Sequence, residues 1–169
     1  MYPTLIRQFN RTLSNLEAIL AKAEAHAAQH NLQSDVFLQA RLAPDMFPLA
    51  RQVQIACDAA KAAASAVAGQ LAPRFADDET TLATLRERVA KTHAYIDGLD
   101  LTGPVSLDAD RLVPAGYPPD KKLRLHDYVV VRQLPNFHFH VVTAYALLRH
   151  WGVPIGKGDY LGQLPLVDA

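Results

Sequence analysis

The segment from residue 134 to residue 151 has the densest set of side chains that could do chemistry, among them Asn136, His138 and His140. Imidazoles bind transition metals and transfer protons near neutral pH. On a helix, side chains that lie one above the other are three or four residues apart. His138 and His140 therefore point to different sides, whereas Asn136 and His140 share a face. We expect the second pair, not the two histidines, to act together.

Two other polar residues lie beside apolar stripes of predicted helices. Gln52 adjoins a stripe that includes Leu49 and Val53, and His93 continues the stripe of the third predicted helix. Gln52, His93, Asn136 and His140 could thus meet in one polar pocket in the core and form a ligand-binding site. Metal sites in helical bundles are built from side chains on facing helices, and imidazole suits zinc or nickel.

A hydrogen-bonded core is the alternative to a metal site. Gln52 and Asn136 carry neutral amides, which are weak ligands for transition metals, and either could bond to His140 without any ion. Unpaired buried polar groups cost about 1–3 kcal/mol, so such bonds are expected. The other polar candidates are predicted to be structural. We expect a solvated face at Arg51, Asp58 and Lys61, surface histidines at His126, His138 and His150, and a buried inert thiol at Cys57.

Composition limits the classes of function. The 169 residues include 17 basic and 17 acidic side chains, a formal net charge of zero. This balance argues against a general nucleic-acid or anionic-membrane surface, which needs a basic excess. The single cysteine fits a reducing compartment, and the chain shows no signal peptide and no membrane-spanning run. We expect one cytoplasmic domain over residues 1–169.

Four amphipathic helices are predicted from apolar residues that recur at steps of three and four. The first covers residues 4–30, and the second runs from its N-cap at Asp45 to residue 68. The third follows the acids at 77–79, which suit the positive end of a helix dipole, and ends at Gly98. The fourth covers residues 135–151. Dense alanine in the second helix predicts a central position or an interface.

Residues 101–132 do not continue the helical pattern. Gly103-Pro104 and residues 114–120 are turn signals, and the β-branched run at residues 128–131 is strand-like. Because a loop of this length is unusual in a compact domain, we expect a small hairpin or an ordered crossover. The predicted fold is an all-α four-helix bundle with a long crossover between the third and fourth helices. Apolar residues outside the helices are predicted to pack on the bundle, namely Phe37, Leu38, Leu42, Leu161, Leu164 and Leu166.

Three stretches of sequence resemble a known family. They are residues 43–54 (APDMFPLARQVQ), residues 134–140 (LPNFHFH) and residues 145–157 (YALLRHWGVPIGK). Together they resemble a bacterial domain-of-unknown-function family in the DinB/YfiT-like clan of four-helix bundles, over nearly the whole chain. The resemblance implies a shared bundle and often a homodimer formed through helix faces.

The resemblance also implies where a metal would bind. Better-known clan members hold a divalent metal with three histidines, one on the second helix and two spaced by four on the fourth. Counting back from Leu148-Arg149 places the spaced pair at Asn136 and His140, and the second-helix position falls at Gln52 or, with a shift, at Gln54. Only His140 matches. We therefore expect a degenerate site with no ion, or with one zinc or nickel ion at His140.

These expectations leave more than one function open. The first is a non-catalytic bundle that binds a small molecule or serves in a stress response. The alternative is a divalent-metal-dependent enzyme, similar to thiol transferases or isomerases, that uses His140 with His93 or Asp58. A third is a structural homodimer built on the alanine-rich helix. None of them involves nucleic acid or a membrane, and the sequence assigns no catalytic residue.

Overall fold

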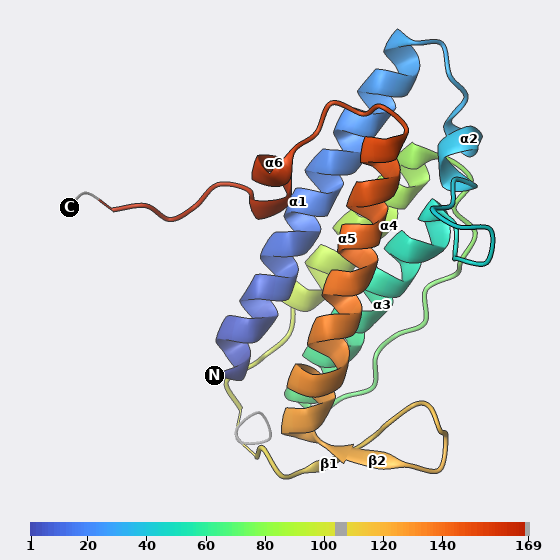
Figure 1. Cartoon of the computed structure of the whole chain (residues 1–169). Helices are drawn as coiled ribbons and strands as arrows, with labels where there is room; N and C mark the ends of the chain where they lie inside the picture. The colour runs from blue at the N-terminus through green and yellow to red at the C-terminus, as the bar shows by residue number, and fades with distance from the viewer. Residues whose placement is uncertain (104–107, 168–169) are drawn as a thin grey trace.

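The structure, a computed structural model, describes residues 1–103 and 108–167. Four long helices lie side by side in a bundle, and two short helices and a hairpin are attached to it (Figure 1). The chain is all-α apart from this hairpin, as predicted. The helices are α1 (Tyr2–Gln29), α2 (Ser34–Leu38), α3 (Leu49–Ala68), α4 (Leu82–Asp97), α5 (Leu134–His150) and α6 (Lys157–Leu161).

The predicted start of α3 is wrong. We expected Asp45 as the N-cap, but the helix begins at Leu49, and Pro48 before it is extended, with φ −70° and ψ 166°. A proline disfavours helical backbone in the residue that precedes it, here Phe47. The helix therefore starts after Pro48, and Asp45 lies in a turn.

The four long helices run in two directions: α1 and α5 one way, α3 and α4 the other (Figure 1). Asn10 near the start of α1 donates to Asp97 at the end of α4, with Nδ2 and Oδ1 2.6 Å apart. Arg51 at the start of α3 pairs with Asp77 just before α4 at 2.6 Å. Residues 69–81 therefore return along the bundle. This second crossover was not predicted, because turn signals after α3 show where a helix ends but not where the chain goes.

The core lies between the four long helices. Phe9 and Phe137 pack with ring centroids 4.8 Å apart and join α1 to α5. On α3 the buried side is formed by small residues, including Ala56, Ala60 and Ala63, all fully buried. Alanine allows α5 and α4 to approach α3 closely. Much of the alanine-rich side is thus used inside the chain, and the predicted contact between two copies on this helix stays a prediction.

The crossover before α5 contains the predicted hairpin, but the predicted strand at residues 128–131 is wrong. Strand β1 (Leu112–Pro114) pairs antiparallel with β2 (Lys122–Arg124), with Val113 opposite Leu123. Residues 128–131 belong instead to a π-helical segment, Asp127–Gln133, which continues into α5. Its Val129 is buried against the bundle, and such packing overrides strand propensity. The turn predicted at Gly103-Pro104 lies partly outside the described residues.

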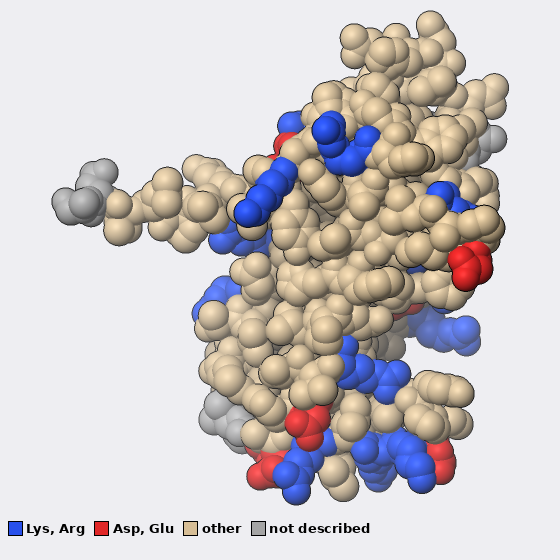
Figure 2. Space-filling model, in the orientation of Figure 1, with Lys and Arg blue, Asp and Glu red and all other residues tan. Residues whose placement is uncertain are grey.

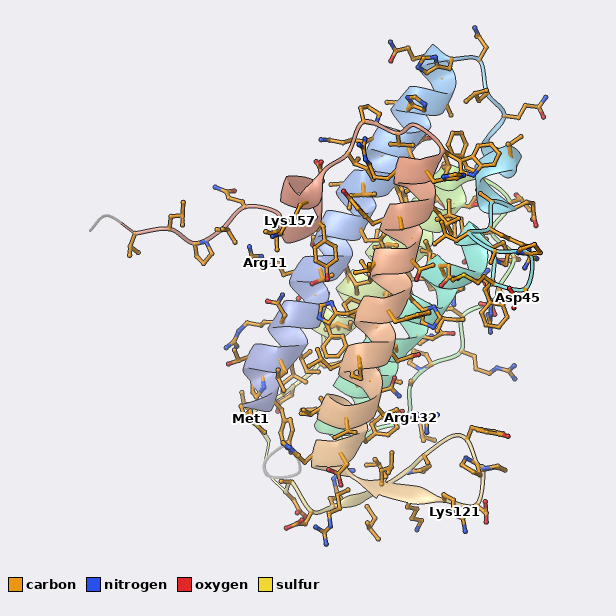
Figure 3. The ribbon with its side chains drawn as sticks, viewed as in Figure 1. Met1, Arg11, Asp45, Lys121, Arg132 and Lys157 are labelled. Carbon is orange, nitrogen blue, oxygen red and sulfur yellow. The ribbon has the colours of Figure 1, made fainter. Side chains whose placement is uncertain are left out.

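The chain after α5 folds back, but mainly through polar contacts. Lys22 Nζ lies 2.5 Å from Asp159 Oδ1, and Asn15 Nδ2 donates to the Tyr160 carbonyl at 3.0 Å. Figure 3 shows Arg11 and Lys157 where α6 crosses α1.

The apolar contacts predicted outside the four long helices form only in part. Phe37 and Leu38 are buried, whereas the other four residues of that set are exposed to different degrees: Leu42, Leu161, Leu164 and Leu166.

None of the helices in residues 1–103 and 108–167 is long and apolar enough to cross a membrane.

Candidate functional site

Gln52 and His140 form a polar pair between α3 and α5. Both are buried, and Gln52 Oε1 lies 2.6 Å from His140 Nδ1. The other end of the amide, Gln52 Nε2, donates to the Phe47 carbonyl at 2.9 Å. The structure thus brings together two of the four predicted site residues, in the hydrogen-bonded arrangement considered as the alternative to a metal site.

These contacts determine which nitrogen of His140 carries the proton. The Phe47 carbonyl only accepts, so the end of Gln52 that faces it must be the NH₂ group. The oxygen of Gln52 then faces His140, and Nδ1 must be the donor. Burial lowers the pKa of His140 below its usual 6.5, and the nearby Arg51 lowers it further. The imidazole is therefore neutral at pH 7, with a lone pair on Nε2.

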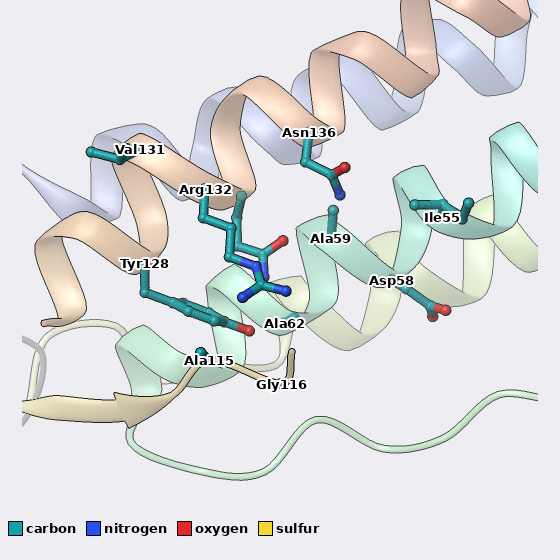
Figure 4. Close-up of a pocket in the computed structure, with 11 residues that line it drawn as sticks. Ile55, Asp58, Ala59, Ala62, Ala115, Gly116, Tyr128, Val131, Arg132 and Asn136 are labelled. Atoms are coloured by element: carbon teal, nitrogen blue, oxygen red, sulfur yellow. The ribbon is translucent and has the colours of Figure 1, made fainter. Parts of the chain in front are cut away.

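Asn136 and His93 do not join this pair. Asn136 lies one helical turn from His140, but it is exposed and faces a cleft above Ala59 of α3 (Figure 4). Alanine is too small to cover Asn136, whereas Gln52 covers His140. His93 is half-buried on α4, and its Nδ1 lies 3.2 Å from Asp97 Oδ2. The expected convergence of four residues is wrong for both.

The residues present do not fit a tightly held metal ion. Gln52 already bonds at both ends of its amide, and Asn136 is exposed in the cleft. Of the three positions at which the resemblance predicted metal ligands, only His140 offers an imidazole nitrogen, Nε2. In the described part of the chain, no group of three or more His, Cys, Asp or Glu side chains could surround an ion.

A cleft of about 560 Å³ lies next to the pair, between α3, the π-helical segment and the hairpin turn. Figure 4 shows Tyr128, Arg132 and Asn136 projecting toward the space above the alanines of α3. Sequence reasoning missed Tyr128 and Arg132, because the strand assigned to residues 128–131 could not place them on a helix facing α3. The cleft is lined by Ile55, Asp58, Ala59, Ala62, Ala115, Gly116, Tyr128, Val131, Arg132, Gln133 and Asn136.

The charged groups of the cleft differ in their partners. Asp58 accepts from Lys61 at 2.9 Å and from Arg88 at 3.2 Å, and its carboxylate points away from Arg132 (Figure 4). Arg132 Nη1 donates to the Tyr117 carbonyl at 3.0 Å, and no carboxylate within residues 1–103 and 108–167 forms an ion pair with it. Burial raises the pKa of Tyr128, so its phenol stays protonated. The cleft therefore presents amide and phenol groups, which both donate and accept hydrogen bonds, and one guanidinium that forms no ion pair with the described carboxylates.

Arg88 is at the centre of a buried ionic cluster on the other side of α3. Its side chain is 2% exposed, and it lies 2.9 Å from Glu79 and 3.0 Å from Asp77. These acids were predicted to serve the helix dipole, but they pair with arginines, and Thr81 caps α4 by accepting from the Thr84 N–H at 3.1 Å. In the sequence, Arg88 lies three residues after Leu85 of the apolar stripe and follows the acids at 77–79. This pattern indicates a buried arginine that pairs with those acids.

The predicted solvated face is wrong for Lys61. Its side chain is buried, and its Nζ lies 3.9 Å from the centre of the Phe75 ring. The reason is the returning segment 69–81, which covers this side of α3. Arg51 and Asp58 are only half-exposed.

The exposure of the remaining predicted surface histidines and of the cysteine agrees with the predictions in part. His150 is exposed and His126 half-buried. His138 was predicted at the surface, but it is half-buried, with Nδ1 2.9 Å from the Tyr160 hydroxyl, because α6 covers it. Cys57 is buried as predicted, and burial raises the pKa of its thiol to about 11. A thiol with so little thiolate at pH 7 is a poor nucleophile.

Comparisons with known proteins agree with this description. The family described as "Domain of unknown function (DUF1993)" matches residues 1–161. A crystal structure of a DinB family member protein from Shewanella denitrificans is 42% identical and covers 99% of this chain and 95% of that chain, with a TM-score of 0.91. The search of curated proteins gave no match. The chain therefore belongs to the DUF1993 family of domains of unknown function, and its fold is that of a DinB-like bundle.

Proposed function

We propose that this protein is a non-catalytic bundle that binds a small organic anion in the cleft between α3 and the π-helical segment. The observation that carries the proposal is Arg132, whose guanidinium faces the cleft while the acid of the lining, Asp58, is engaged by Lys61 and Arg88. A guanidinium offers planar paired donors that match a carboxylate. The bond from Arg132 to Tyr117 holds the side chain in position for such a ligand.

The rest of the lining suits an anion with an apolar part. Gln133 and Asn136 supply amide donors, and the Tyr128 ring with Ala59 and Ala62 offers apolar surface. A volume of about 560 Å³ is within the range of small-molecule sites, about 300–1,000 Å³. Charged, polar and apolar groups from three elements thus converge on one space.

Three aromatic probes of similar size and different charge test this proposal: benzoate, benzamide and benzylamine. Binding to the folded state raises the melting temperature in proportion to affinity and concentration. We expect benzoate to raise it, benzamide to raise it less, and benzylamine to leave it unchanged. An equal response to all three, or none to benzoate at millimolar concentration, would contradict anion binding.

A pair of variants locates the site. Arg132→Gln should abolish the benzoate response, because it removes the cation that faces the cleft. Arg124→Gln is the matched control, since Arg124 lies on the exposed hairpin 3.6 Å from Asp110 and outside the cleft lining. Loss of the response in both variants would indicate nonspecific binding to basic groups.

A second candidate is a divalent-metal-dependent enzyme of the thiol transferase or isomerase class that uses His140. The observation in its favour is the lone pair on His140 Nε2, which follows from the bond between Nδ1 and Gln52. Protein purified without chelator would then contain stoichiometric zinc or nickel that is lost in His140→Ala. Metal content that is the same in both proteins would exclude this candidate.

We also propose that two copies associate through the outer face of α5. Phe139 and Val142 are 56% and 47% exposed there, and Figure 2 shows few charged side chains over the middle of this face. The zero net charge gives little repulsion between copies. In sedimentation velocity, Phe139→Lys should convert a dimer to a monomer, whereas Leu71→Lys, in the exposed segment after α3, should not. A monomeric wild-type protein would contradict the proposal.

A further inference from the structure

Two histidines lie at the end of α1, His26 in its last turn and His30 as the C-cap residue that follows it. Neither takes part in the proposed cleft or in the pair at His140. They are four residues apart, and the His30 backbone N–H donates to the His26 carbonyl at 3.1 Å, so the helical turn includes both. Their ring centroids are 4.3 Å apart. This is the spacing at which two imidazoles on one helix face can bind the same ion.

The distance between the rings agrees with coordination. With metal–nitrogen bonds of about 2.1 Å, two imidazoles at a right angle on one ion have ring centroids about 4.5 Å apart. The observed 4.3 Å is close to this value, so the two rings already lie at about the separation that coordination requires. His30 is exposed and His26 half-exposed, and an ion can therefore reach them from solvent.

We propose that His26 and His30 form a binding site for a divalent transition metal, with Cu²⁺ bound most tightly and Ni²⁺ and Zn²⁺ more weakly. Imidazole suits these ions, and affinities for such sites are highest for Cu²⁺. Water completes the coordination, because within residues 1–103 and 108–167 no third His, Cys, Asp or Glu joins the pair. Mg²⁺ and Ca²⁺, which prefer oxygen ligands, are not bound.

The position of the pair also favours a cation. The negative end of a helix dipole lies at the last turn of α1. The end of α5 lies beside it: a Cβ at Gly152 would be 3.8 Å from His26 Nε2, and Figure 1 shows both helices ending in the same direction. Carbonyl groups from two helix ends thus contribute negative potential around the imidazoles.

The single tryptophan, Trp151, reports on this site. Phe37 packs against both His26 and Trp151, with its ring centroid 6.5 Å from that of His26 and 5.8 Å from that of Trp151. Paramagnetic Cu²⁺ or Ni²⁺ bound at the pair should therefore quench Trp151 fluorescence. Titration of the full chain with CuCl₂ should give saturable quenching at one ion per chain, and calorimetry should give the same stoichiometry. MgCl₂ should cause no quenching.

Three variants decide the assignment. His30→Gln should weaken Cu²⁺ binding at least about tenfold, because even loss of a ligand's supporting partner costs about 10–100-fold. His150→Gln, adjacent to Trp151, and His140→Gln should bind as the wild type does. Unchanged binding in His30→Gln, or equal loss in either control, would overturn the site. Lowering the pH should weaken binding in the wild type, since protons compete for imidazole nitrogen.

Discussion

Gln52 connects two groups, the Phe47 carbonyl and the His140 imidazole, and this explains the chemical state of His140. The amide donates to the Phe47 carbonyl in the turn before α3 and accepts from His140 on α5. Since the carbonyl cannot donate, the amide has one allowed orientation, and the imidazole has one tautomer. Gln52 thus holds His140 as a hydrogen-bonded core residue.

Replacing Gln52 with leucine tests this connection. The change keeps the side-chain volume similar but leaves His140 Nδ1–H and the Phe47 carbonyl unpaired. We expect the free energy of unfolding in urea to fall by about 1–3 kcal/mol. Gln8→Leu on the exposed side of α1 is the control and should change it by no more than about 0.5 kcal/mol. Similar losses in both variants would show that the pair contributes nothing specific.

The buried histidines predict a dependence of stability on pH. Burial lowers the pKa of His138 and His140 below the usual 6.5. The unfolded chain therefore takes up protons near pH 6.5 that the folded chain binds only at lower pH. The stabilisation is complete above that value and is lost as the pH falls toward the folded pKa values. We expect the free energy of unfolding to decrease between about pH 7 and pH 5.

The same experiment on variants checks the cause. A protein with both His138→Gln and His140→Gln should lose less stability over this pH interval than the wild type. NMR titration of the two imidazoles should give midpoints below pH 6.5. Midpoints above 6.5 would contradict the sign of the prediction.

Among the elements, α3 contacts the three other long helices and the π-helical segment. Arg88 of α4 holds the returning segment against it. Arg88 lies 3.2 Å from Asp58 on α3 and 2.9 Å from Glu79 in the segment. It also donates to the Ala76 carbonyl at 2.6 Å. Arg88 thus joins α3, α4 and residues 76–79. These contacts hold the long connection between the two parallel helices against the bundle.

Arg88→Met should be strongly destabilising, because Glu79, only 7% exposed, would lose its partner. Breaking a buried ion pair on one side costs about 3–5 kcal/mol. Arg86→Met is the control: its pair with Glu24 is 36% and 38% exposed, and such surface pairs contribute about 0–1 kcal/mol.

A double variant separates the lost pair from general damage. Glu79→Gln in the Arg88→Met background removes the buried charge and should recover part of the loss. Additive losses in urea denaturation would show that the two residues do not interact.

At the scale of the whole molecule, the segment after α5 folds back and packs α6 against α1. Gly162 ends α6 with φ 64°, and a Cβ there would overlap the side chain of Asn15. Glycine is therefore required twice, for the left-handed backbone and for the close approach to α1. The bond between His138 and Tyr160 then connects the same segment to α5.

Gly162→Ala should release α6 from α1, and Gly158→Ala should not. A Cβ at Gly158, inside α6, meets nothing within 4 Å, so alanine there should be neutral or stabilise by about 0.4–1 kcal/mol. Hydrogen exchange of residues 157–162 should be faster only in Gly162→Ala. Equal exchange in the two variants would contradict the role of Gly162.

Local patterns in the sequence were sufficient for the existence of the four long helices, though not for α2, α6 or the start of α3. The apolar stripes that predicted α1, α4 and α5 are buried, since a helix needs only its own periodicity to form an apolar side. They also predicted that Gln52 and His140 would meet, because an amide and an imidazole beside facing stripes must find partners. The prediction that Asn136 joins this pair was wrong, since its exposure depends on Ala59, which lies opposite it on another helix.

The sequence by itself therefore determined the four long helices, an ordered connection before the fourth of them, and that His140 is a core residue. Only the tertiary structure decided the return of residues 69–81, which buries Lys61 and Arg88, and the helical state of residues 128–131, which turns Tyr128 and Arg132 toward α3. The physical reason is that periodicity acts within one element. Burial of a charge and formation of a cleft depend on which elements become neighbours, and no local pattern specifies that.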